Sequence, residues 1–262
     1  MSHAVGVFNW FIGHRTHVVL VHRWLYERAG ILHRDLSLNN IMYRIVKGKV
    51  YGVLTDYDLA SWTRWLTGNC TKTSEQRTGT PPFMAFGLLK GTDTLHLYRH
   101  DVESLFYIMV ILATHYEIEG PKKGGEGGVR KRQGKLPFGR WFDQPFYEDL
   151  ASFKKGFLSD FKDLDLSPTF EDLRGWLLKL RKSFRRGFQA KEQRLEGDDT
   201  EESCDEGTPA PFDGETLGGH VTYSALILPA RSLTGALKGL IIRYDPPSRL
   251  SPSSTGAAQA DA

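Results

Sequence analysis

Residues 33–40 carry side chains that could assist the transfer of a phosphoryl group. They read H-R-D-L-S-L-N-N, which places a carboxylate at Asp35 and an amide at Asn40. Phosphoryl transfer to a hydroxyl needs a carboxylate that accepts or orients the hydroxyl proton, and an amide oxygen that binds the metal bridging the phosphates. Asp35 and Asn40 have the residue types and the spacing for these roles. The alternative is an ordinary loop in which Arg34 and Asp35 form an ion pair.

A second acidic motif follows a short β-prone run. Asp56, Tyr57 and Asp58 come directly after residues 50–55, and Asp56 is sixteen positions beyond Asn40. A carboxylate at the end of a hydrophobic strand is costly unless it binds a cation. We therefore predict that Asp56 and Asn40 bind Mg²⁺ against the phosphates of ATP. Alone, the three residues could equally form a turn; their place after the first motif favours the metal site.

The elements that would position these residues are mainly helical. Periodic apolar residues predict helices over four ranges: 18–28, 101–117, 146–157 and 170–188. The second of these is apolar on nearly every side, which is typical of a central core helix. Residues 41–46 and 50–55 predict a β-hairpin that carries Asp56 at its end. Residues 61–82 predict a long loop, either functional or disordered, and residues 121–135 a solvated loop.

The composition excludes several classes of protein. With 34 basic and 31 acidic residues the net charge is +3, which gives no reason to expect nucleic acid or membrane as a partner. The two cysteines, Cys70 and Cys204, show no disulfide or metal-ligand spacing. The most apolar run, residues 105–113, is about half of the ~20 residues that span a bilayer. We expect an intracellular protein, cytoplasmic or nuclear.

Two further segments resemble parts of the eukaryotic protein kinase superfamily. Residues 79–85, G-T-P-P-F-M-A, are similar to the segment that closes a kinase activation loop, and residues 99–105, R-H-D-V-E-S-L, to the start of the central kinase helix. The resemblance implies that the Thr80 hydroxyl bonds Asp35, a feature of Ser/Thr kinases. It also implies that Asp101 accepts backbone N–H bonds from residues 33–40, although a carboxylate near a helix start can simply cap the helix.

Within this superfamily the chain resembles the fungal-type protein kinase domain family. The resemblance depends on residues 26–35, Y-E-R-A-G-I-L-H-R-D, on Ser37 in place of the usual Lys, and on residues 56–60, D-Y-D-L-A. Residues 170–188 and 216–223 resemble the end of that family's domain. The similarity covers roughly residues 20–230 and implies a kinase-like C-terminal lobe, mainly α, with a small hairpin for the metal-binding Asp. We divide the chain into four parts: lobe 1–190, acidic linker 191–215, C-terminal family segment 216–245, and disordered tail 246–262.

The resemblance also assigns roles to the site residues. Asp35 would act as the base, Thr80 would position it, and Asn40 and Asp56 would hold Mg²⁺ and ATP. Arg34 is the residue type that captures a phosphate on the activation segment. The candidate phosphorylation sites are Thr67, Thr71, Thr73, Ser74 and Thr78. His14, His17 and His22 have no acidic or cysteine partners nearby in the sequence, which favours a packing role over a metal site.

Two departures from the family pattern stand out. The family has a Glu two positions after Met84-Ala85 that pairs with a buried Arg late in the lobe, and this chain has Gly87 there. Loss of one partner can cost ~3–5 kcal/mol, so we expect a destabilised lobe. The 34 residues before Asp35 contain no lysine and no Gly-rich loop, so we expect no N-terminal lobe.

Three functions follow from these features. The first is an ATP- and Mg²⁺-dependent Ser/Thr protein kinase with an unidentified protein substrate. Because the Lys and the Gly-rich loop are missing, we expect little or no transfer by this chain alone. The second is a non-catalytic binding module derived from a kinase, or the product of a truncated gene model, which the missing Lys and Gly-rich loop favour. The third is a small-molecule phosphotransferase of the aminoglycoside or choline kinase type, which residues 79–85 and Asp101 disfavour.

Overall fold

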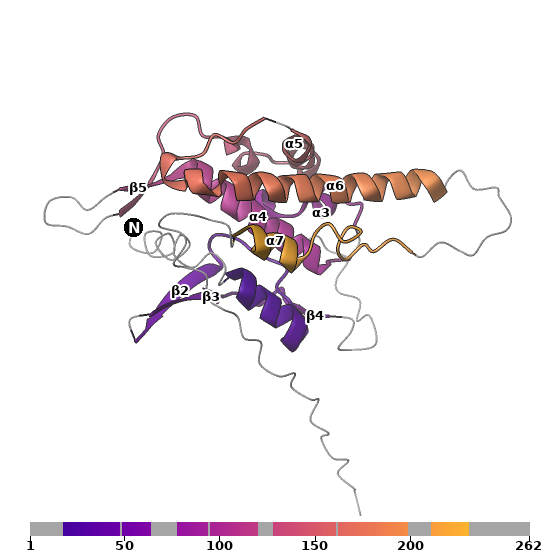
Figure 1. Ribbon diagram of the computed structural model, residues 1–262, viewed down its shortest axis with the longest axis horizontal. Coiled ribbons are helices and arrows are strands. Elements are labelled where there is room, and N and C mark those ends of the chain that lie inside the picture. The colour runs from indigo at the N-terminus through magenta and orange to yellow at the C-terminus, as the bar shows by residue number, and fades with distance from the viewer. Residues whose placement is uncertain are drawn as a thin grey trace, which may run out of the picture.

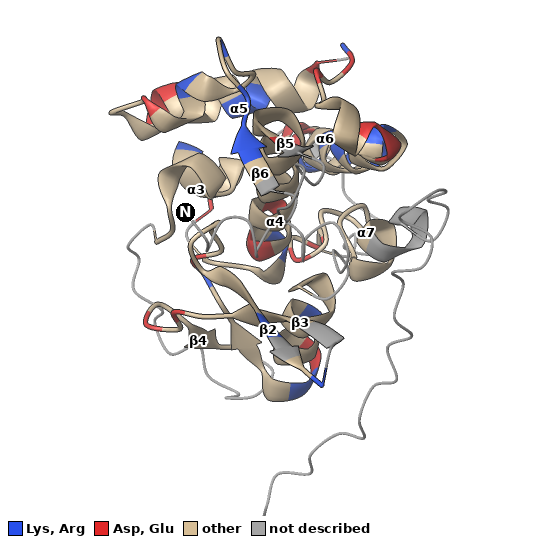
Figure 2. Cartoon of the chain, turned by 90° about the vertical axis from the view of Figure 1, so that its left-hand side faces the viewer, with Lys and Arg blue, Asp and Glu red and all other residues tan. Residues whose placement is uncertain are grey.

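The computed structural model is mainly helical, with short paired strands both below the helices and beside the upper ones (Figure 1 and Figure 2). It describes residues 18–47, 49–63, 78–93, 95–119, 128–160, 162–198 and 211–230. The tail 246–262 and the four candidate phosphorylation sites from Thr67 to Ser74 lie outside these ranges.

One fully buried helix forms the centre of the molecule. This helix, α4 (Tyr98–His115), has all of its residues buried, as expected from a sequence that is apolar on nearly every side. Helix α6 (Arg174–Asp198) lies across it in Figure 1 and contributes Phe184, whose ring stacks on Phe106 of α4 at 5.3 Å between centroids. Helices α3 (Phe86–Lys90) and α5 (Tyr147–Ser159) pack against each other.

The strands form three two-stranded antiparallel sheets within the described residues. In the hairpin, β2 (Ile41–Val46) pairs with β3 (Lys49–Leu54), and Ile41 faces Leu54. This register extends to the flanking residues, because the Thr55 N–H donates to the Asn40 carbonyl at 2.9 Å. The hairpin predicted from the sequence is therefore present, and it brings Asn40 beside the chain that leads into Asp56.

The chain enters the site through a helix that ends in a glycine. Residues 18–24 are helical and continue as the π-helical turn η1 (Leu25–Ala29), close to the predicted range 18–28. Gly30 ends the turn with φ = 67°, a left-handed conformation that glycine adopts at little cost. The short strand β1 (Ile31–Leu32) follows and pairs with β4 (Ser61–Trp62), so residue 33 starts from a fixed position.

Three segments differ from the sequence-based expectation. Part of the predicted loop 121–135 is strand β6 (Gly128–Lys131), which pairs with β5 (Tyr116–Glu119). The first residues of the predicted helix 170–188 belong instead to the 3₁₀-helix η4 (Pro168–Leu173), which leads into α6. Pro168 is its first residue, a position where the fixed φ of proline suits a helix. Helix α6 then continues to Asp198, eight residues beyond the expected end of the lobe at 190.

The C-terminal segment 211–230 packs on the helical body. It ends in α7 (Tyr223–Ala230), and Leu217, Val221 and Leu226 are at most 1% exposed. The Trp176 indole of α6 donates to the Leu226 carbonyl at 2.8 Å. Among the described residues, no helix combines the length and apolar character needed to cross a bilayer.

Candidate active site

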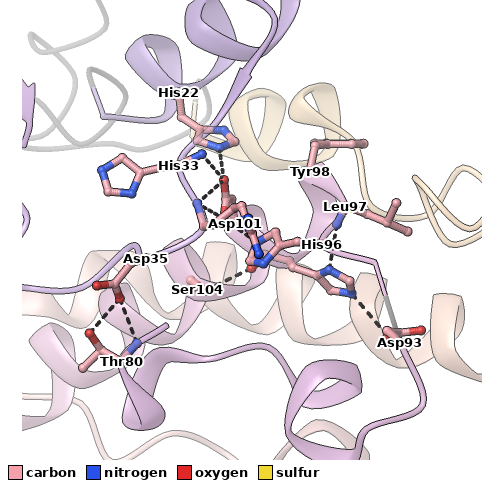
Figure 3. Close-up of polar contacts among 12 residues, drawn as sticks. His22, His33, Asp35, Thr80, Asp93, His96, Leu97, Tyr98, Asp101 and Ser104 are labelled. Atoms are coloured by element: carbon pink, nitrogen blue, oxygen red, sulfur yellow. Dashed lines mark hydrogen bonds and ion pairs between the residues drawn. The ribbon is translucent and has the colours of Figure 1, made fainter. Parts of the chain in front are cut away.

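The buried carboxylate of Asp101 organises the start of the catalytic loop, the name used below for residues 33–40. Its Oδ2 accepts the backbone N–H of His33 at 2.9 Å, and the Arg34 N–H lies 3.1 Å from Oδ1 (Figure 3). These are the backbone bonds that the resemblance implied. Asp101 lies in the first turn of α4, but all of its hydrogen bonds go to other segments. Its contribution is therefore to hold the loop on the core rather than to cap the helix.

Two histidines complete the set of donors around Asp101. The Nε2 of His22 lies 2.9 Å from Oδ2, and the Nε2 of His96 lies 2.8 Å from Oδ1. Burial would raise the pKa of the Asp101 carboxyl, but these histidines outweigh it and hold the pKa well below the usual range. Neither partner was predicted from the sequence: His22 is 79 positions from Asp101, and His96, although only five positions away, belongs to no motif. His14 and His17 lie outside the described residues.

Three donors fix the orientation of Asp35. The Thr80 hydroxyl and the Thr80 backbone N–H both lie 2.8 Å from Oδ1 of Asp35 (Figure 3). From the other end of the loop, the Asn40 amide donates to the Asp35 carbonyl at 2.8 Å and approaches Oδ2 at 3.3 Å. No ion pair joins Arg34 and Asp35, both of which are described, so the ordinary-loop alternative does not explain the conformation.

The hairpin places Asn40 and Asp56 at the same end of the sheet. The Asn40 side chain uses its amide nitrogen within the loop, which leaves Oδ1 for another partner. The Asp56 carboxylate is exposed and has no hydrogen bond within the described part of the chain. Mg²⁺ is usually held by one or two protein oxygens together with phosphate oxygens and water, so this small set fits the ion. No cluster of three His, Cys, Asp or Glu side chains suited to a metal occurs among the described residues.

The backbone is strained at both motifs. Arg34 has φ = 69° and Asp56 has φ = 62°, values that cost a residue with a side chain free energy and that concentrate at functional sites. Asp58 has no positive φ, so its side chain is accommodated without this strain. Tyr57, between the two aspartates, is 39% exposed and packs against His33 at 4.9 Å between ring centroids.

Arg34 is buried with part of its charge unpaired. Its side chain is 8% exposed, and its Nε has no hydrogen-bond partner. Burial lowers the pKa of the guanidinium, with Asp101 acting in the opposite direction. The hydroxyl of Thr78, the one candidate phosphorylation site in the described residues, is buried without a partner too. These features suit Arg34 to an incoming anionic group.

The space beside Gly87 is filled by another carboxylate, while the expectation that an arginine late in the lobe is left unpaired stays a prediction. A Cβ added at Gly87 would collide with the Oδ2 atom of Asp93, so the carboxylate of Asp93 occupies the space that a side chain at position 87 would need. That carboxylate pairs with Arg99 at 2.9 Å and with Lys191 at 2.5 Å. A carboxylate six residues further along the chain thus stands at the place of the missing Glu.

Histidine 100 supports the same carboxylate. Its Nδ1 accepts the Leu97 N–H at 2.9 Å, which leaves Nε2 to donate to Asp93 at 3.2 Å (Figure 3). Burial would raise the pKa of the Asp93 carboxyl, but the bond from His100 and the charge of Arg99 outweigh it and keep the pKa below its ordinary range. Asp93 is therefore charged at neutral pH.

Comparison with known proteins agrees with the sequence resemblance over part of the chain. Residues 14–113 match the profile of the family described as fungal protein kinase. A comparison with curated proteins found no match. The matched range contains Asp35, Asn40, Asp56, Thr80 and Asp101, and it ends inside α4. The similarity of residues 170–188 and 216–223 to the end of the family's domain stays a prediction. Over residues 14–113, the chain is therefore similar to the fungal protein kinase family.

Proposed function

We propose that the described residues form the C-terminal lobe of a Ser/Thr protein kinase, which transfers phosphoryl groups from ATP to protein hydroxyls. The observation that carries this proposal is the pair of bonds from Thr80 to Asp35, across 45 positions of sequence. They join the segment that closes the activation loop to the candidate base. That arrangement favours a protein kinase over a small-molecule phosphotransferase, because the latter class is not expected to have a segment like residues 79–85.

The hydrogen bonds assign different tasks to the two oxygens of Asp35. Oδ1 already accepts two short bonds from Thr80, while Oδ2 has one longer contact of 3.3 Å with Asn40. Oδ2 is therefore the atom left to accept the proton of a substrate hydroxyl. Because Thr80 holds the carboxylate in place, little reorganisation is needed when the hydroxyl arrives.

Asn40 and Asp56 would hold Mg²⁺, and through it the phosphates of ATP. The bound ion would supply positive charge to the phosphate oxygens as the γ-phosphoryl group leaves. The contribution of the chain itself is positional. The hairpin register sets Asn40 beside Thr55, and the strained turn at Asp56 directs the chain away from the sheet.

The test uses the whole chain with Mg²⁺, radiolabelled ATP and casein as a generic protein substrate. Any transfer should need Mg²⁺, and Asp35→Asn should reduce it by about 10²–10⁴-fold, the usual contribution of a general base. Asp172→Asn, which changes an exposed carboxylate on η4 far along the chain, is the matched control and should behave like the wild type.

Two other outcomes would overturn the proposal. Binding of ATP with Mg²⁺ that is lost in Asp56→Asn, without any transfer, would establish a non-catalytic binding module. Transfer that Asp35→Asn leaves unchanged would show that Asp35 is not the base.

A further inference from the structure

A chain of buried hydrogen bonds connects the C-terminal segment 211–230 to the catalytic loop. The Tyr223 hydroxyl lies 2.8 Å from Nδ1 of His22, and Nε2 of His22 lies 2.9 Å from Oδ2 of Asp101. Oδ2 in turn accepts the N–H of His33 at 2.9 Å. His22 and Asp101 are 0% exposed and Tyr223 is 6% exposed, so water does not compete for these bonds.

The direction of the bonds follows from the groups themselves. Burial raises the pKa of the Tyr223 phenol well above its usual value, so the hydroxyl keeps its proton. Among the described residues His22 Nδ1 is the one acceptor within reach of that hydroxyl. A ring that accepts at Nδ1 carries its proton at Nε2, and this proton is donated to Asp101. Tyr223 thereby selects the form of His22 that can hold Asp101.

Tyr223 is itself held from several sides. The residues around it bond the core: Trp176 donates to the Leu226 carbonyl at 2.8 Å, and the Arg99 Nε donates to the Gly214 carbonyl at 2.6 Å. The Tyr98 hydroxyl donates to the Val221 carbonyl, and the Tyr98 ring lies 5.3 Å from that of Tyr223. The segment is thus a fixed part of the lobe, although it lies well beyond the matched range 14–113.

We propose that Tyr223 and His22 are positioning residues for the catalytic loop, and that the segment 211–230 sets the place of Asp35 through them. Asp101 holds the N–H groups of His33 and Arg34, and the next residue is Asp35. A loss of the His22 bond lets the carboxylate of Asp101 shift, and the strained conformation at Arg34 then loses its support. The effect on transfer rests on the function proposed above, whereas the order of the loop can be measured without it.

The first test needs no variant. The ¹⁵N chemical shifts of His22, measured by NMR in the intact protein at pH 7.5, report which ring nitrogen carries the proton. We expect the Nε2–H form. A proton on Nδ1 would overturn the proposal, because His22 could not then accept from Tyr223.

The second test compares two Tyr→Phe changes by amide hydrogen exchange. Tyr223→Phe removes the hydroxyl that bonds His22, and Tyr98→Phe removes a nearby buried hydroxyl that bonds the backbone of the same segment. We expect Tyr223→Phe to speed exchange of the His33 and Arg34 amides about fivefold, the change equivalent to one hydrogen bond. Tyr98→Phe, whose lost hydroxyl does not contact His22, should speed exchange of these two amides less. Equal effects of the two variants would show that Tyr223 acts through general stability alone.

A double variant tests whether the effect passes through His22. In His22→Gln the side-chain amide can donate to Asp101 without help from Tyr223, so protection of the His33 and Arg34 amides should be retained. Tyr223→Phe added to this background should change their exchange no further. A full fivefold effect in the double variant would refute the coupling.

Kinetics separate this proposal from the proposed function. If the chain transfers phosphoryl groups, Tyr223→Phe should lower kcat while KM for ATP stays constant, and Tyr98→Phe should lower kcat less. If no transfer occurs in the wild type, the function fails, and the exchange results still decide whether Tyr223 and His22 position the loop.

Discussion

Restoring the family's glutamate at position 87 should weaken this protein, even though the sequence resemblance alone suggests the reverse. Gly87 has no side chain, and an added Cβ would meet the Oδ2, Cγ and Cβ atoms of Asp93. Any residue other than glycine therefore displaces the Asp93 carboxylate. Gly87→Ala tests this displacement alone, and Gly87→Glu adds a second negative charge.

The cost can be worked from the ion pairs that Asp93 makes. Arg99, which is 1% exposed, pairs with Asp93 at 2.9 Å, and Lys191 pairs with it from α6 at 2.5 Å. Removing one partner of a buried pair costs ~3–5 kcal/mol, because the other charge stays buried. We expect a loss of this size in the free energy of unfolding for Gly87→Ala. Gly87→Glu should lose less than Asp93→Gly if its carboxylate reaches Arg99.

The assay is urea unfolding of the whole chain, followed by tryptophan fluorescence. Gly156→Ala is the matched control: it lies in α5, its added Cβ meets nothing within 4 Å, and it should stabilise the helix by about 0.5–1 kcal/mol. The double variant Gly87→Glu/Asp93→Gly moves the carboxylate from one position to the other. It should recover part of the stability that Asp93→Gly loses.

Equal stability of Gly87→Ala and Gly156→Ala would refute this reasoning, because the Asp93 carboxylate would then have room to move without losing its partners. No recovery in the double variant would show that position 87 cannot serve Arg99.

Three further predictions concern other parts of the lobe. Thr80→Ala should lower phosphoryl transfer about 10- to 100-fold through loss of a bond to a charged group, and Thr80→Ser should retain activity; equal rates for both would exclude the hydroxyl's role. Trp176→Phe should speed amide exchange in residues 216–226, because the Leu226 carbonyl loses its buried donor at a cost of about 1–3 kcal/mol; unchanged exchange would contradict this. Burial lowers the pKa of His100 to about 3, so below pH 6.5 the unfolded chain binds a proton that the folded protein does not. The free energy of unfolding contributed by His100 is complete above pH 6.5. In urea unfolding, the total should fall by about 2 kcal/mol between pH 7.5 and 5, and by less in His100→Gln. An equal fall in the two proteins would exclude His100 as the cause.

Features that depend on neighbouring residues were predictable from the sequence. The apolar character of residues 101–117 on all sides predicted the buried helix α4, since a helix with no polar face must be enclosed. Two β-prone runs around Lys47 predicted the hairpin that places Asn40 and Asp56. The spacing of Asp35 and Asn40, and the resemblance of residues 79–85, led to the bond between Thr80 and Asp35. The first and last residues of the helices were predicted less accurately. The start at η4 and the end of α6 depend on packing at Pro168 and beyond Phe188.

Features that join distant residues were decided by tertiary packing. Nothing near Gly87 in the sequence indicates that the Asp93 carboxylate fills the space of a side chain at position 87. That contact needs both the absence of a Cβ at Gly87 and the course of the loop between the two residues. His22 carried no sign of a role, since Asp101 is 79 positions away and Tyr223 is 201 away. Periodicity and motif spacing describe contacts within a few residues, whereas a buried polar group takes as partner whichever donor the folded core brings to it. The motifs could thus be read from the order of the residues, and the support that holds them in place arises when the chain is packed around α4.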